Sequence, residues 1–154
     1  MPYIGVMDRD TFWKYVGLID REALRDEDER DAVEPLIEAL VKCTIDELAA
    51  FEDHLAQVLY DLDGRIYADH SGKSGMSADG FLFTRCYVVA RGRLHYEAVL
   101  ADPTKMPRTS HAWCESLLFV AVQAWATITG KEETDWDHVS PVSYETGSNA
   151  AAWA

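Results

Sequence analysis

Apolar residues recur at helical spacing through most of this chain. The clearest stripe consists of Ile45, Leu48, Leu55, Val58, Leu59, Leu62 and Ile66. Three or four residues separate most neighbours in this stripe, which places them on one face of a helix. Thr44 and Glu47 have the spacing of a capping box, in which each side chain bonds the other residue's backbone amide. We therefore expect an amphipathic helix from Thr44 to about Ala68.

A second predicted helix, from Ser77 to Ala101, is apolar on two faces. One face carries Phe83, Tyr87, Ala90, Leu94 and Ala98, and the other carries Leu82, Cys86, Val89, Tyr96 and Leu100. Ser77 is a favoured capping residue, and the negative charge of Asp79 suits the first turn. Asp102-Pro103 is expected to end the helix. Because a helix that is apolar on two faces has neighbours on both sides, we expect it to be central.

Shorter apolar patterns predict further helices on either side of this pair. Asp8 or Asp10 is expected to cap a first helix, with Phe12, Val16, Ile19 and Ala23 on one face. A second helix, with Pro35 in its first turn, is predicted from the apolar residues Val33, Leu36, Ile37, Leu40 and Val41. The last helix is predicted from the apolar pattern between Trp113 and Ile128, and Gly130 is expected to end it. The resulting expectation is an all-α single domain of four to five helices around one core.

The chain becomes polar after Gly130, with scattered aromatic residues. Trp136, Tyr144 and Trp153 lie in this part. Large rings are unfavourable in water, so we expect them to dock on the helices. The predicted organisation is a helical domain over residues 1–130 and an irregular C-terminal tail over residues 131–154 that packs on it.

Composition limits the class of protein. Of 154 residues, 48% are hydrophobic, which is enough for one folded domain, and the net charge of −13 disfavours nucleic acid. That charge suits a basic protein partner or a cationic small molecule, although acidity also serves solubility alone. No apolar run approaches the roughly 18 residues that cross a bilayer. Residues 1–5 lack signal-peptide character, and Cys43, Cys86 and Cys114 form no C-x-x-C motif. We expect a cytoplasmic protein.

Arg85 is the most informative candidate for function, because it lies in an almost wholly apolar helical run. A buried arginine needs a carboxylate, a ligand or water. Candidate partners are Asp61, Asp53, Glu115 and Asp79, and Asp61 on the neighbouring helix is favoured. One interpretation is a structural ion pair that sets helix register, and the other is an anion-binding arginine. The candidate ligand-binding residues are Arg85, Asp61, Asp79, Tyr87, Phe81 and Arg91.

Other chemistry has weaker support. His111, Cys114 and Glu115 share a helical face, but no second matching pair is present, so no metal is expected. No catalytic motif is found, and no cofactor is predicted. The sequence therefore favours a protein without catalytic activity.

An acidic stretch runs from Asp20 to Glu34. It holds Asp20, Glu22, Asp26, Glu27, Asp28, Glu29, Asp31 and Glu34, partly offset by Arg21, Arg25 and Arg30. We interpret it as a solvated helix end and loop, with a partner-binding patch as the alternative.

Several short segments, in order, resemble the DUF4240 family of bacterial proteins, whose function is unassigned. They are Asp10–Trp13, Ile45–Glu47, Phe51, Tyr60–Leu62, Tyr67, Ser77–Phe81, Arg85, Val89, Gly92-Arg93, Ala101–Pro103 and Glu115–Ala121. The sequence departs from the family pattern at Asp63, where a tryptophan is usual. The resemblance implies an all-helical domain and no particular activity.

Two functions remain open at this point. The first is a non-catalytic interaction or regulatory module, for example one that neutralises a basic protein such as a toxin or nuclease through residues 20–34. The alternative is a small-molecule-binding protein or small enzyme of specialised metabolism, with an anion-binding pocket around Arg85. A structural homodimer is a weaker third reading, and the sequence fits either a monomer or a homodimer.

Overall fold

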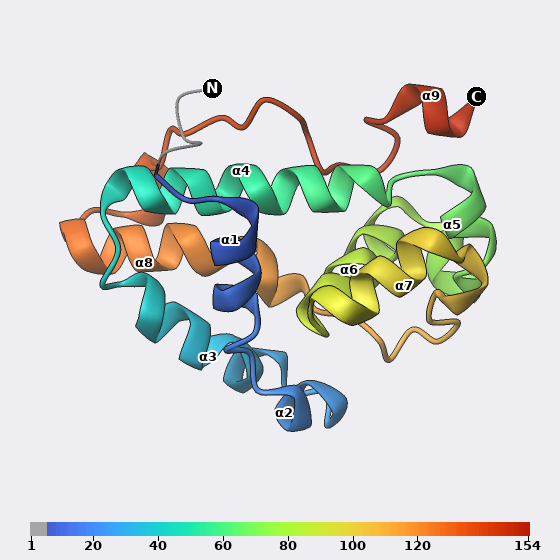
Figure 1. The fold of residues 1–154 in the computed structure, drawn as a ribbon, viewed down its shortest axis with the longest axis horizontal. Coiled ribbons are helices and arrows are strands. Elements are labelled where there is room, and N and C mark those ends of the chain that lie inside the picture. The colour runs from blue at the N-terminus through green and yellow to red at the C-terminus, as the bar shows by residue number, and fades with distance from the viewer. Residues whose placement is uncertain (1–5) are drawn as a thin grey trace.

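Helix α4, Ile45–Asp61, lies lengthwise along the molecule in the computed structural model, which describes residues 6–154 (Figure 1). The predicted capping box is confirmed. Thr44 Oγ1 accepts from the Glu47 amide at 3.1 Å, and Glu47 Oε1 accepts from the Thr44 amide at 2.9 Å. Residues 1–5, for which no signal peptide is expected, lie outside the described residues.

The described residues contain helices and no strand, so the all-α prediction is confirmed. The other α-helices are α1 Arg9–Val16, α2 Arg21–Arg25, α3 Glu29–Leu40, α5 Arg65–Asp69, α6 Ala78–Ala90, α7 Arg93–Ala101, α8 Val120–Thr129 and α9 Ala150–Trp153. Short 3₁₀ helices are η1 Gly72–Met76, η2 Pro103–Lys105, η3 Glu115–Phe119 and η4 Glu133–Asp135. Four to five helices was therefore an undercount for residues 6–154.

Two of the predicted helices are each divided. The one predicted from Ser77 to Ala101 breaks at Gly92, whose φ of +102° is unfavourable for other residues. A Cβ atom there would also collide with the Arg21 guanidinium. The helix predicted from Thr44 to Ala68 ends at Asp61 and resumes as α5, and the turn between them carries the buried Asp63.

The N-terminal region also differs from the prediction. Helix α1 ends at Val16, so Ile19 and Ala23 lie beyond it, and α2 and the start of α3 occupy the predicted acidic loop. Pro35 lies inside α3 rather than in its first turn. Proline has no N–H for the carbonyl of Asp31, but Asp31 is exposed and water can replace that bond.

Helix α6 is central, as predicted. Its serine cap is present, with Ser77 Oγ accepting from the Gly80 amide at 3.0 Å, and both faces are buried. Helix α6 contacts α4, η1 and η3, while α8 lies against both α3 and α4. In Figure 1, α3, α6 and α8 all lie below α4.

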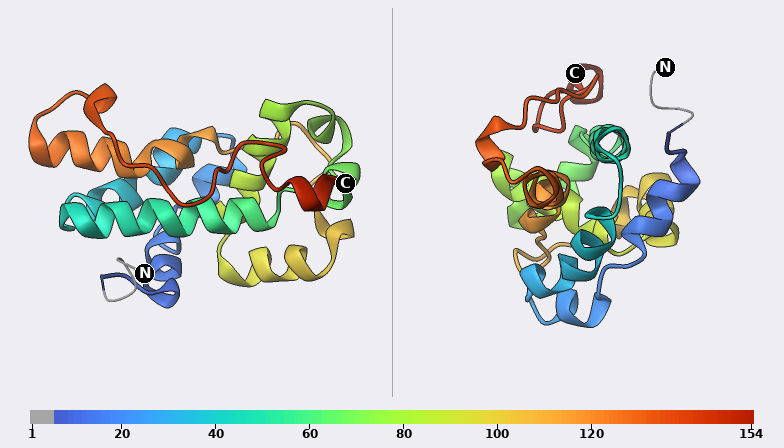
Figure 2. Two further views of the ribbon diagram at one scale, coloured as in Figure 1. Left: turned by 90° about the horizontal axis from the view of Figure 1, so that it is seen from above. Right: turned by 90° about the vertical axis from the view of Figure 1, so that its left-hand side faces the viewer.

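The C-terminal tail begins where Gly130 ends α8 in the left-handed conformation, with φ of +71°. It crosses over α4 and ends in α9, close to α5 (Figures 1 and 2). Trp136 packs on Trp125 with ring centroids 5.4 Å apart. Arg65 Nη2 donates to the carbonyl of Trp153 at 2.7 Å. Both tryptophans of the tail therefore dock on the helical part of the chain.

Candidate functional site

The side chain of Arg85 is completely buried and is held by protein groups. Nη1 donates to the carbonyls of Leu59 at 2.9 Å and Tyr144 at 3.0 Å, and Nη2 donates to Thr146 Oγ1 at 3.0 Å. The guanidinium also lies 4.7 Å from the ring centroid of Phe81, a cation–π distance. Within residues 6–154, Nε has no acceptor.

The carboxylate nearest Arg85 is Asp63, which is also completely buried. Asp63 Oδ1 lies 4.0 Å from Arg85 Nη2. Burial lowers the pKa of Arg85, and the charge of Asp63 opposes that effect. We call this buried pair the tail clamp, because both side chains bind the C-terminal tail.

Asp63 organises the end of the tail. Its carboxylate accepts from the backbone amides of Gly147 at 3.1 Å and Asn149 at 2.9 Å, and from Trp153 Nε1 at 2.8 Å. Asn149 Nδ2 adds a bond to the carbonyl of Tyr60 at 3.1 Å. The tail clamp therefore attaches residues 144–153 to the C-terminal end of α4 and to the middle of α6.

Asp61 was the wrong partner for Arg85. It is exposed and accepts from Gln57 Nε2 at 2.9 Å. Helix α4 ends at Asp61, and the turn that follows directs Asp63 inward. Sequence reasoning missed Asp63 as a partner, although its departure from the family pattern was a signal.

The other candidates around Arg85 are dispersed. Of the predicted set, Phe81 alone contacts Arg85 among the described residues. Asp79 is exposed in the first turn of α6, Arg91 is exposed at its C-cap, and Tyr87 is half-buried. The predicted group does not converge on one pocket.

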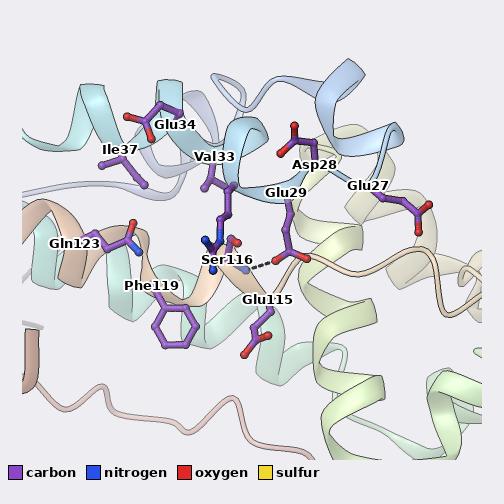
Figure 3. Close-up of a pocket in the computed structure, with 11 residues that line it drawn as sticks. Glu27, Asp28, Glu29, Val33, Glu34, Ile37, Glu115, Ser116, Phe119 and Gln123 are labelled. Atoms are coloured by element: carbon purple, nitrogen blue, oxygen red, sulfur yellow. Dashed lines mark hydrogen bonds between the residues drawn. The ribbon is translucent and has the colours of Figure 1, made fainter.

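A different part of the molecule holds a groove of about 840 Å³ between α3 and the η3–α8 segment (Figure 3). It is lined by Glu27, Asp28, Glu29, Arg30, Val33, Glu34, Ile37, Glu115, Ser116, Phe119 and Gln123. We call it the acidic groove. Among the described residues that line it, five are carboxylates and Arg30 is the one cation. The partly buried Ile37 and the exposed ring of Phe119 supply apolar surface, while Val33 is buried.

Some of these carboxylates already have partners. Glu29 Oε1 accepts from the Ser116 amide at 2.6 Å and thereby joins α3 to η3. Glu27 Oε1 lies 2.8 Å from His111 Nδ1. A hydrogen bond and charge repulsion from Asp28 raise the pKa of Asp31, which lies three residues later and does not line the groove. The acidic groove is therefore a region where negative charges are crowded together.

A second cavity, of about 580 Å³, lies between the tail and helices α4 and α8. We call it the tail cavity; it is lined by Glu52, Ala56, Leu118, Phe119, Val122, Trp136, His138, Val139, Ser140, Pro141, Val142, Ser143, Tyr144 and Glu145. Burial and the neighbouring Asp53 raise the pKa of Glu52 to about 7. Asp53 Oδ1 lies 2.7 Å from Nε2 of His138.

The predicted helical face of His111, Cys114 and Glu115 does not form. His111 is next to Glu27, while Cys114 is fully buried and precedes η3. Across residues 6–154, no three His, Cys, Asp or Glu side chains gather in a way that could hold a metal ion. None of the helices in this part of the chain is long and apolar enough to cross a membrane.

Comparison with known families gives a match that covers most of the chain. The family model described as a protein of unknown function, DUF4240, matches residues 7–127. Comparisons with curated proteins and with solved structures give no significant match. The acidic groove and both residues of the tail clamp lie within the matched range, whereas the tail lies beyond it. Because the match covers most of the sequence, this chain belongs to the DUF4240 family.

Proposed function

We propose that this protein is a non-catalytic interaction module and that its acidic groove binds a basic protein. The observation that carries the proposal is a groove of about 840 Å³ in which five carboxylates surround apolar surface. Positive side chains of a partner would meet the carboxylates. An apolar side chain between them would contact Ile37 and Phe119.

Charge crowding supports a cationic partner. A hydrogen bond with Asp28 and, to a smaller extent, repulsion from Asp28 raise the pKa of the neighbouring Asp31, and a cation bound near Asp28 would relieve that repulsion. The net charge of −13 adds long-range attraction, which raises the rate of association with a basic protein. A toxin or nuclease whose active surface is positively charged is one example of such a partner. Binding would neutralise it by covering that surface.

Backbone strain lies at the edge of the same groove. Glu27 has φ of +62°, a region that residues other than glycine rarely adopt. The backbone amide of Glu27 donates a hydrogen bond to the carbonyl of Leu24, and the amide of Asp28 donates one to the carbonyl of Ala23. These two bonds form a Schellman motif that ends α2, with Glu27 at the position where glycine is usual. Strained residues are common at binding sites, and a carboxylate here contributes to the groove's charge at a cost in stability.

The alternative function, anion binding at Arg85, has weaker support. Arg85 donates to three protein oxygens and lines neither the acidic groove nor the tail cavity. Its contacts match those expected of a structural residue that fixes the tail.

Charge reversal in the groove tests the proposal. The probe is a short fluorescent peptide of lysine, arginine and leucine. Its binding to the protein is measured by fluorescence anisotropy at several salt concentrations. Glu34→Lys with Glu115→Lys should weaken binding by about tenfold or more, since both carboxylates line the groove. The matched control is Glu132→Lys with Glu133→Lys, which changes net charge equally on exposed tail residues outside the groove.

Hydrogen exchange locates the bound peptide. Amides within residues 20–34 should exchange more slowly in the complex. An equal loss of affinity in both double variants would mean that net charge alone attracts the peptide. That result, or unchanged exchange over residues 20–34, would overturn the groove as the binding surface.

A further inference from the structure

The tail cavity is a second place with the features of a binding site, and the proposed interaction with a basic protein does not use it. Its volume of about 580 Å³ falls in the range of small-molecule sites, which is about 300–1,000 Å³. Most of its lining is apolar or aromatic. Segments that are distant in sequence build it, namely α4, the η3–α8 segment and the tail from Trp136 to Glu145.

Glu52 is an acidic side chain of this cavity that lacks a partner among the described residues. Its side chain is partly buried in the wall formed by α4. Within residues 6–154, no hydrogen bond reaches its carboxyl group. A carboxyl group in apolar surroundings without a donor is unfavourable when ionised, and an opposite charge inside the cavity would remove that penalty.

The other charged groups around the cavity indicate the sign of the ligand's charge. The titratable groups around Glu52 are Asp53 on α4 and His138, Tyr144 and Glu145 on the tail, while the α8 side contributes apolar residues. His138 Nε2 lies 2.7 Å from Asp53 Oδ1, so the Asp53 carboxylate already has a partner. No lysine or arginine is among the described residues that line the cavity. A cationic ligand is favoured over an anion.

The walls indicate the rest of the ligand. Phe119, Trp136 and Tyr144 line the cavity, and aromatic faces bind both apolar groups and organic cations. The hydroxyl of Ser140, another lining residue, is buried without a hydrogen-bond partner in the described part of the chain, so a small shift of the tail would be needed for it to bond a ligand.

We propose that the tail cavity binds a small organic amine, with its ammonium group against the Glu52 carboxylate and its apolar body among Phe119, Trp136 and Tyr144. The tail is then part of the binding site as well as a structural strap. This site is separate from the acidic groove, so either proposal can fail without the other.

Calorimetry with three related probes tests the ligand class. The probes are 2-phenylethylamine, the uncharged 2-phenylethanol and the anionic 3-phenylpropionate, titrated into the full-length protein. The amine should bind at least about tenfold more tightly than the alcohol, and the anion should bind most weakly. Equal binding of amine and alcohol, or no binding of the amine at millimolar concentration, would overturn the proposal.

The variant Glu52→Gln tests the residue. It keeps the shape of the side chain and removes the charge, so it should bind the amine at least about tenfold more weakly and bind the alcohol unchanged. Glu38→Gln, an exposed residue of α3 outside the cavity, is the matched control and should bind like the parent protein. Unaltered amine affinity in Glu52→Gln would contradict the role of Glu52.

Proton release gives an independent measurement. At pH 7 part of Glu52 is protonated, and an ammonium ion beside it should displace that proton to the buffer. Titrations in buffers of different ionisation enthalpy should show this release in the parent protein and not in Glu52→Gln. Equal proton release by both proteins would assign the proton to another group and would also contradict the proposal.

Discussion

Asp63 accepts a hydrogen bond at 2.8 Å from the indole Nε1 of Trp153, which lies 90 residues further along the chain. The same carboxylate accepts from two tail amides and lies beside the Arg85 guanidinium. Each partner satisfies a polar group that would otherwise be costly to bury. The end of α4 and the C-terminus are therefore fixed to each other through one buried carboxylate.

Removing this carboxylate should release the tail. Asp63→Ala leaves Arg85 buried without its counterion and two tail amides without an acceptor, so we expect a loss of about 3–5 kcal/mol in the free energy of unfolding. Asp61→Ala, an exposed carboxylate two residues earlier, should cost less than about 0.5 kcal/mol. Urea denaturation measures both. Faster exchange of the Gly147 and Asn149 amides should accompany Asp63→Ala, and equal losses in the two variants would argue against the clamp.

Arg85 and Asp63 should depend on each other energetically. Arg85→Met removes the donors to Tyr144 and Thr146, so it loosens the same segment that Asp63→Ala loosens. We expect the double variant to be less destabilised than the sum of the single variants by about 1–3 kcal/mol. A double-mutant cycle measured by urea denaturation gives this coupling. Strictly additive losses would mean that each residue holds the tail independently.

Glu27→Gly should stabilise the protein. Glycine adopts the positive φ of this position without the steric cost that glutamate carries, which is worth about 1 kcal/mol. Glu27→Ala should not give this gain, because alanine retains a Cβ atom. Thermal unfolding distinguishes the two variants. If the acidic groove binds basic peptides, Glu27→Gly should also weaken that binding while it raises stability.

Stability should decrease as the pH rises through the titration of Glu52. Its pKa is raised from an ordinary value of 4.5 to about 7 in the folded protein, so the folded state holds the proton more tightly than the unfolded chain. The Glu52 contribution is fully present below about pH 4.5 and is lost by about pH 7. It amounts to about 3 kcal/mol, at about 1.4 kcal/mol for each pH unit between the two pKa values.

Glu52→Gln isolates this effect because glutamine does not titrate. Its free energy of unfolding should change less than that of the parent protein between these pH values, and it should be the more stable protein at pH 8. Glu38→Gln should follow the parent curve. Parallel curves for Glu52→Gln and the parent would assign the pH dependence to other groups.

The sequence alone determined the features that depend on neighbours within a few residues. The Thr44–Glu47 capping box, the Ser77 cap, the end of a helix at Asp102 and the left-handed Gly130 form within single turns. Local geometry decides these features, because donor and acceptor are at most four residues apart. Apolar periodicity in the same way determined the all-α class and the central position of α6.

Tertiary structure decided which residues work together. The sequence singled out Arg85 as a buried charge, but the choice of Asp63 over Asp61 depended on where α4 ends and on the path of a tail about 80 residues later. Carboxylates of α3 and Glu115 line the same acidic groove, and Glu52 and Tyr144 line the same tail cavity, although the residues of each pair are far apart in the sequence. Hydrophobic periodicity indicates which face of a helix is buried, but it does not indicate which distant segment covers that face. The reason is that the hydrophobic effect is non-directional, so the contact partners follow from the packing of the whole chain.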